Sequence, residues 1–205
     1  MAYNILEKIF GSASRVKIMK LFLFNEATLF DKEAIIDRSK VSATEAVKEL
    51  KILQDIKLLK KRTVTKKTET KTGKVSKKRI DSYILNPNFP LMKHLKNLLI
   101  NNEPLQHADI QKRLNKVGKI KLIIISGVFI QCEDSRVDIL IVGDQIKEKS
   151  LKNIIKIMES EIGKELRFSF LETEDFKYRN SVCDRLLRDI FDYQHEIVVD
   201  KIGLN

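Results

Sequence analysis

The spacing of hydrophobic and polar positions in the first 60 residues predicts three helices in succession. The first covers 14–24, where apolar side chains recur at helical spacing, and the second covers 31–38. The third begins after Ser42, because Ser42 and Glu45 have the spacing of a capping box. Three apolar residues form its predicted buried stripe: Ala46, Leu50 and Leu53.

After the third helix the pattern changes to that of strands. Residues 58–70 and 75–85 are rich in Thr and Val, and the tetrapeptide 71–74 between them contains a glycine, which predicts a hairpin tip. Three helices followed by a hairpin are the order of a winged helix-turn-helix, which we therefore predict over residues 1–88. A linking segment with one further helix is predicted over 89–103.

The second half of the chain alternates between helix and strand. The predicted helices are 105–116, 146–162, a short one capped by Thr173, and 182–191. The predicted strands are 120–126, 137–142, 166–171 and 196–199. This order predicts a small α/β domain of three or four strands over 104–205, and an α+β class for the chain as a whole.

The net charge of +11 is distributed unevenly between the two halves. Residues 1–120 contain 26 Lys and Arg against 12 Asp and Glu, a net charge of +14. Residues 121–205 contain 13 against 16, a net charge of −3. This asymmetry indicates that the first half meets a polyanion and the second does not.

The predicted hairpin is the most basic part of the chain, with nine Lys and Arg between residues 61 and 79 and Glu69 as the one acid. A solvated loop would explain an isolated lysine run, but this run follows a helix-turn-helix pattern. We expect the third helix to enter the major groove of DNA and the hairpin to contact phosphates. The residues expected to contact double-stranded DNA are Ser42, Thr44, Lys48, Lys51, Lys66, Lys67, Lys71, Lys74, Lys77, Lys78 and Arg79.

The first half also resembles a known family. The string 9–18, Ile-Phe-Gly-Ser-Ala-Ser-Arg-Val-Lys-Ile, is similar to the opening of ArsR-type winged-helix transcriptional regulators, and the resemblance covers residues 5–90. The resemblance implies a DNA-binding regulator, and members of that family commonly form dimers. This chain departs from the pattern at Lys57, where a glycine is usual. It also has no cysteine before Cys132, so the metal sensing of some members is not implied.

The second half, residues 105–200, resembles the minimal nucleotidyltransferase domains. The residues that carry the likeness are the turn Ser126-Gly127 and Asp138, on the predicted strand that follows it. That chemistry needs two carboxylates on one strand face to hold Mg²⁺, yet the second position is Leu140. A further acid, Glu172, would serve only if its strand ended beside Asp138. We therefore expect Ser126, Gly127 and Asp138 to be a vestigial nucleotidyltransferase site without catalytic activity.

Other function classes have little support in the sequence. The longest apolar run is too short to span a membrane, and the two cysteines and three histidines have no metal-ligand spacing. We expect no metal or other cofactor and a cytoplasmic location. The predicted function is a transcriptional regulator whose second half senses a nucleotide, dimerises or docks a protein. Two alternatives remain open: an active nucleotidyltransferase that modifies protein or RNA, and a structural RNA-binding or chromatin-like protein that uses the hairpin alone.

Overall fold

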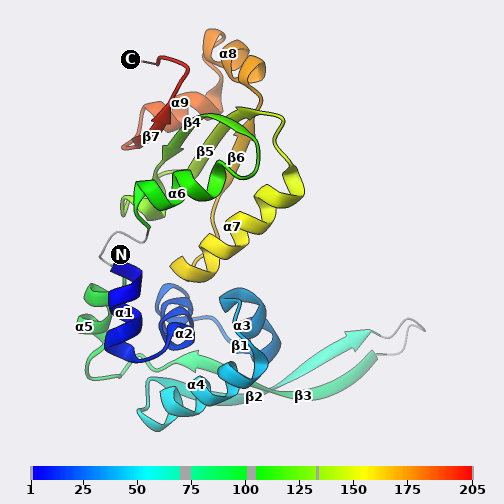
Figure 1. Cartoon of the computed structure of the whole chain (residues 1–205). Coiled ribbons are helices and arrows are strands. Elements are labelled where there is room, and N and C mark those ends of the chain that lie inside the picture. The colour runs from blue at the N-terminus through cyan, green and yellow to red at the C-terminus, as the bar shows by residue number, and fades with distance from the viewer. Residues whose placement is uncertain (1, 70–74, 101–104, 133, 205) are drawn as a thin grey trace. The chain divides into compact units, whose positions relative to one another are not determined.

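The computed structural model describes residues 2–69, 75–100, 105–132 and 134–204; for 2–4, 66–69 and 75–78 it describes the backbone alone (Figure 1). The structure is a mixture of helix and strand, in keeping with the α+β class. The chain divides into two compact units. The N-terminal unit contains residues 1–100 with 160–164, and the C-terminal unit contains residues 101–159 with 165–205.

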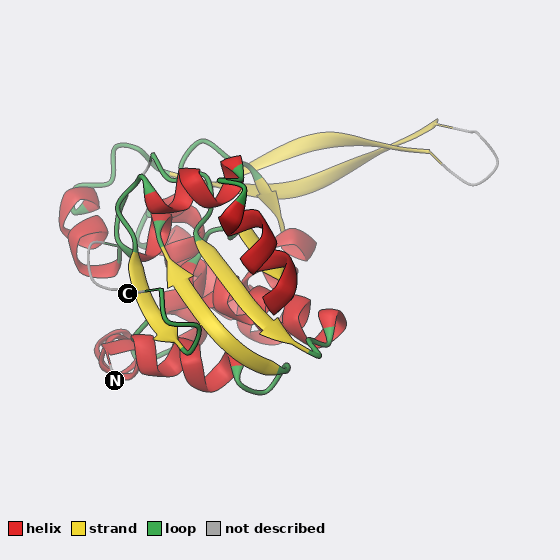
Figure 2. Ribbon diagram, turned by 90° about the horizontal axis from the view of Figure 1, so that it is seen from above, coloured by secondary structure: helices red, strands yellow, loops and turns green. Residues whose placement is uncertain are grey.

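The N-terminal unit contains the three predicted helices and both hairpin strands. Its elements are α1 (Ala2–Phe10), α2 (Ala13–Phe24), β1 (Phe30–Asp31), α3 (Lys32–Ser39), α4 (Ala43–Asp55), β2 (Leu59–Glu69), β3 (Val75–Leu85) and α5 (Met92–Leu99). The strands form an antiparallel sheet in the order β1-β3-β2. In Figure 2, β2 and β3 form one long two-stranded ribbon. The predicted hairpin tip, 71–74, lies outside the described residues.

A single apolar core holds the helices of this unit against the base of its sheet. The predicted stripe of α4 is part of it, since Ala46, Leu50 and Leu53 are all buried. Helix α2 contributes residues on every side, which explains why it has almost no polar face. Neither α1 nor the two-residue strand β1 was predicted. Strand β1 forms only by pairing with β3, where Phe30 and Asp31 lie opposite Tyr83 and Ser82.

The C-terminal unit is a four-stranded mixed sheet with helices. Its elements are α6 (His107–Leu114), β4 (Lys119–Ile125), the short 3-10 helix η1 (Gly127–Phe129), β5 (Ile139–Asp144), α7 (Glu148–Ile162), β6 (Phe168–Leu171), α8 (Thr173–Ser181), α9 (Arg185–Phe191) and β7 (Glu196–Asp200). The strand order is β6-β5-β4-β7. Strands β5 and β6 are parallel, and the other pairs are antiparallel.

One face of this sheet packs on α8 and α9. Leu122, Ile124, Leu140 and Val142 form a buried cluster that includes Phe176 of α8, together with Leu187 and Ile190 of α9. The alternate residues Ile123, Ile139 and Ile141 are equally buried, so the middle strands are covered on both faces. This explains their continuous apolar sequences.

Three sequence-based predictions in this unit were wrong in detail. The strand predicted from Val137 begins only at Ile139, because the backbone of Asp138 pairs with Arg167 outside the regular ladder. Thr173 does not cap α8: it is the first helical residue, and Glu172 occupies the N-cap position. The helix predicted from Val182 begins at Arg185, because the side chain of Asp184 caps it by accepting from Leu186 N.

Candidate nucleic-acid interface and the Asp138 cluster

Helix α4 begins with the capping box that the sequence predicted. Ser42 Oγ accepts from Glu45 N at 3.2 Å, and Ser42 N donates to Glu45 Oε2 at 3.1 Å. The Ser42 hydroxyl also donates to the same carboxylate at 2.7 Å, and these bonds lower the pKa of Glu45. Ser42 is exposed, as expected for a DNA contact, but its hydroxyl is already engaged within the chain.

The other three DNA-contact candidates on α4 lie on one exposed face. Thr44, Lys48 and Lys51 are exposed, and Val47, which sequence reasoning missed, is 50% exposed between them. Their positions i, i+3, i+4 and i+7 place all four side chains on one side of the helix, opposite its buried residues. We call Thr44, Val47, Lys48 and Lys51 the α4 stripe. Val47 was not among the candidates from the sequence, although its place on the helical wheel between Thr44 and Lys51 predicts that its side chain is exposed.

A buried ion pair holds α4 against α2. Arg15 Nε donates to Glu49 Oε2 at 2.7 Å, and Glu49 is buried. Arg15 Nη1 also donates to the carbonyl oxygen of Phe10 at 2.7 Å, which connects the end of α1 to the same contact. Because Glu49 lies on the buried side of α4, this pair stabilises the rotation that leaves the α4 stripe exposed.

The end of α4 places Lys57 in a conformation that favours glycine. This residue has a left-handed backbone with φ of 62°, the conformation for which glycine is favoured. Lys57 N donates to Gln54 O at 2.8 Å and Leu58 N to Leu53 O at 3.0 Å, the two bonds of a Schellman motif. Asn86 Nδ2 donates to the Lys57 carbonyl at 2.8 Å, which stabilises the turn from α4 into β2.

The register of the hairpin places cationic residues opposite each other. Lys66 pairs with Lys78 and Lys67 with Lys77 across β2 and β3. Like charges at opposed positions destabilise a ribbon unless counterions or a polyanion neutralise them. Arg79 is exposed and lies opposite Thr65. Lys71 and Lys74 lie outside the described residues, and the side chains of the two lysine pairs are not described.

The base of the hairpin is different, because a carboxylate neutralises one of its cations. Lys61 Nζ lies 2.7 Å from Asp81 Oδ2, and both side chains are nearly half exposed. The hydrogen bond between them raises the pKa of Lys61 and lowers the pKa of Asp81. This ion pair therefore offsets part of the positive charge at the base of the hairpin.

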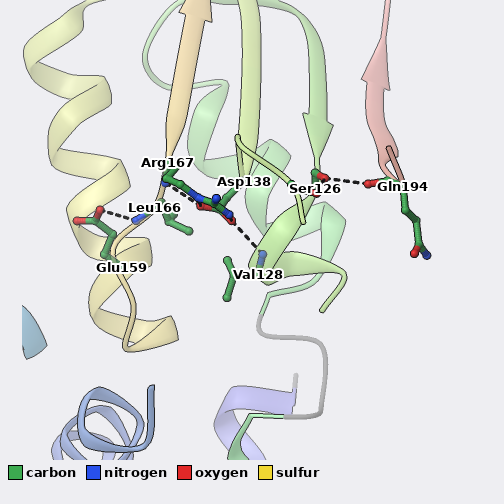
Figure 3. A network of polar contacts seen from close by, with 8 residues as sticks. Ser126, Val128, Asp138, Glu159, Leu166, Arg167 and Gln194 are labelled. Carbon is green, nitrogen blue, oxygen red and sulfur yellow. Dashed lines mark hydrogen bonds and ion pairs between the residues drawn. The ribbon is translucent and has the colours of Figure 1, made fainter. Parts of the chain in front are cut away.

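In the C-terminal unit, Asp138 is the centre of a closed polar cluster (Figure 3). Its carboxylate is fully buried and accepts four hydrogen bonds. Arg167 supplies three of them, from Nε at 3.1 Å, Nη2 at 3.0 Å and its backbone N at 2.8 Å, and Val128 N supplies the fourth at 3.0 Å. A carboxylate has about four acceptor sites, so no oxygen lone pair of Asp138 remains for a cation. The bond to Asp138 raises the pKa of Arg167.

Gly127 and Ser126 are also used within the cluster. Gly127 has φ of 55°, and a Cβ there would lie 2.0 Å from Asp138 Oδ1. Glycine is thus required by the close approach of this carboxylate. The buried Ser126 hydroxyl donates to the Gln194 carbonyl at 2.8 Å and lies 2.5 Å from the Ser135 hydroxyl. The three vestigial-site candidates therefore lie together, but internal partners occupy their polar groups.

The remaining acids do not complete a metal site beside Asp138. Leu140 is buried in the core between the sheet and the helices α8 and α9. Glu172 follows β6 at the end remote from Asp138, because β5 and β6 are parallel and Arg167 is the residue beside Asp138. Arg167 lies beside Asp138, and Glu172 is five positions further along this extended segment. The two acids are therefore about 16 Å apart. Among the described residues, no group of three or more His, Cys, Asp or Glu could hold a metal ion.

Arg167 was not identified from the sequence. Its signal was weak, a single arginine in the segment predicted as the third strand of this half, and its partner lies 29 residues earlier. Glu159 of α7 helps to position the segment, since its Oε1 accepts from Leu166 N at 2.9 Å (Figure 3). Only the parallel pairing of β5 with β6 brings this arginine to Asp138.

No helix in the described parts of the chain has the length and apolar character needed to cross a membrane. Comparisons with protein-family models, with curated proteins and with solved structures give no match to this chain.

Proposed function

We propose that this protein is a DNA-binding transcriptional regulator whose N-terminal unit is a winged helix-turn-helix. The observation that carries the proposal is the α4 stripe, an exposed face of a firmly packed helix, followed in the chain by a ribbon with opposed lysines. An ion pair and a capping box stabilise the helix without using Thr44, Lys48 or Lys51. Those three side chains are therefore available to a partner.

The division of labour follows from the chemistry of each part. The first two turns of α4 would enter the major groove, where Thr44 and Lys48 reach base edges and Lys51 reaches phosphate. The hairpin lysines would follow the backbone and release counterions, which gives affinity without sequence preference. The order of helices and the β1-β3-β2 sheet support this reading of the N-terminal unit.

We further propose that the C-terminal unit is a nucleotidyltransferase-like module without transferase activity. The closed Asp138 cluster supports this, because its one carboxylate is saturated by Arg167 and Val128 and the second position is a core leucine. The unit would then act as a dimerisation surface, a ligand sensor or a docking site for a protein. An active transferase is the second candidate, and the order of β4, the Ser126-Gly127 turn and β5 is the observation in its favour.

Salt-dependent binding of the full chain to duplex DNA tests the main proposal. With about six phosphates contacted, log K should fall against log salt with a slope on the order of −5. Replacing Lys74, Lys77 and Lys78 by Ala should flatten that slope by about 3 units for every duplex tested. The matched control removes the same charge from exposed residues of α7, by replacing Lys149, Lys152 and Lys156, and should leave the slope unchanged.

Two further measurements separate the alternatives. Equal affinity for duplex RNA and single strands would favour the RNA-binding alternative over a transcriptional regulator. Incubation with labelled nucleoside triphosphates, Mg²⁺ or Mn²⁺ and cell extract tests the transferase alternative. Label transfer that disappears in Asp138→Ala would overturn the proposal of an inactive module.

A further inference from the structure

Along the α4 stripe, exposed apolar groups come first and two lysines follow. Ala43 and Thr44 are exposed in the first turn of α4, and Val47 follows at 50% exposure. Lys48 and Lys51 come next along the α4 stripe. Valine is a poor choice for an exposed helix position, since its branched side chain loses rotamer freedom there. Val47 is absent from the buried core of its unit, so packing does not explain it.

A carboxylate limits how far along the helix a nucleic acid can lie. Asp55, eleven residues after Thr44, falls on the same side of α4 and is exposed. Its charge would repel phosphates at the end of the helix. The contact surface is therefore restricted to the part of α4 that precedes Asp55, where the exposed apolar groups of the α4 stripe are the Thr44 methyl and the Val47 side chain.

We propose that Thr44 and Val47 recognise thymine C5-methyl groups in the major groove, while Lys48 and Lys51 bind the flanking guanine or phosphate oxygens. The inference rests on the proposed function and specifies its substrate: duplex DNA with thymine at the positions facing the start of α4. Thymine is the base that presents an apolar group in the major groove, and threonine methyl and alanine-like side chains are suited to it. RNA carries uracil, which lacks this methyl group.

The test uses the full chain and a duplex obtained by selection from random DNA sequences. Each thymine is replaced in turn by deoxyuridine, which removes one methyl group and leaves every hydrogen-bonding atom. At one or two positions the affinity should fall about fourfold, the value of one buried methyl-sized group. Val47→Ser and Thr44→Ser, which remove the apolar groups, should abolish that difference between thymine and deoxyuridine while duplex binding persists.

Val182→Ser, which makes the same change at a similarly exposed valine of the C-terminal unit, is the matched control and should keep the full difference. Thermal melting of each variant checks that it is folded. Equal affinity for thymine and deoxyuridine at every position would overturn the inference and leave the proposed function standing. Absence of any sequence-selected duplex binding would overturn the proposed function, and this inference with it.

Discussion

The α4 stripe and the Asp138 cluster each contain residues that the sequence picked out as functional, but they differ in what those residues contact. Thr44, Lys48 and Lys51 are exposed and lie on one side of a capped helix. Asp138 is buried and accepts four hydrogen bonds from within the chain. A side chain can bind a partner only with atoms that the fold has not already used.

The difference also shows that similar residue positions do not establish a binding site. The hydrogen-bond partners of each candidate side chain have to be examined as well. The Ser126-Gly127 turn and Asp138 lie together as the resemblance implies, yet an arginine stands where a cation would be needed. The guanidinium neutralises the carboxylate and donates two of the four hydrogen bonds that its oxygens accept. Among the described residues, Thr44 and Lys51 of the α4 stripe have no comparable ion-pair partner.

The largest expected effect is on the stability of the Asp138 cluster. Arg167→Ala should lower the free energy of unfolding by about 3 kcal/mol, because it leaves a buried carboxylate without its charge partner. Urea denaturation of the full chain measures it. Arg136→Ala, which breaks an exposed pair with Asp189, is the control and should cost less than about 1 kcal/mol. If folded Arg167→Ala also loses DNA affinity, the comparison between an open and a closed site fails.

The second effect concerns the packing of α4. Glu49→Gln should cost about 2 kcal/mol in the free energy of unfolding, because the buried side chain loses its charged partner Arg15. It should also weaken DNA binding, since α4 would no longer be held in one rotation. Glu148→Gln, which removes an exposed pair with Lys152, should change neither measurement appreciably. Unchanged DNA affinity in a destabilised Glu49→Gln would show that this ion pair does not position the stripe.

A smaller effect is expected at the cap of α4. Ser42→Ala should cost about 1 kcal/mol at neutral pH, measured by thermal melting. The cap lowers the pKa of Glu45 in the folded chain. Its stabilisation is therefore present above the ordinary carboxyl pKa of 4.5 and is lost as the pH falls below it. The cost of Ser42→Ala should accordingly be smaller at pH 3 than at pH 7.

The variant Ser42→Ala also tests whether Ser42 contributes to the choice of DNA sequence. The Ser42 hydroxyl is engaged with Glu45, much as the carboxylate of Asp138 is engaged with Arg167. Ser42→Ala should therefore leave the preferred DNA sequence unchanged, in contrast to changes at Thr44 or Lys48. A shifted base preference in selected sequences would place Ser42 among the residues that read DNA.

The smallest effect is a gain in stability at the end of α4. Lys57→Gly should raise the free energy of unfolding by about 0.5 kcal/mol, because glycine adopts the left-handed conformation of this position without steric cost. Lys57→Ala removes the same charge but keeps Cβ, so it should bring no gain. Chemical denaturation measures the free energy of unfolding of both variants. Equal values for the two would show that backbone strain at Lys57 is negligible.

Local features of this protein could be predicted from the order of its amino acids alone. The third helix, its capping box, its buried stripe and the two hairpin strands all appear where the pattern predicts them. Each depends on residues within about four positions of one another or on local composition, so neighbouring residues suffice to define them. The charge difference between the two halves is likewise a property of composition, whatever the fold.

Which chemical groups remain available to a partner depends on contacts between distant parts of the chain. The Arg15–Glu49 pair joins residues 34 positions apart, and the Arg167–Asp138 pair joins residues 29 positions apart. The second pair exists because β6 lies parallel to β5, which brings Arg167 beside Asp138 and leaves Glu172 at the far end. Strand order and direction arise from the packing of the whole unit, and no local pattern in the chain encodes them.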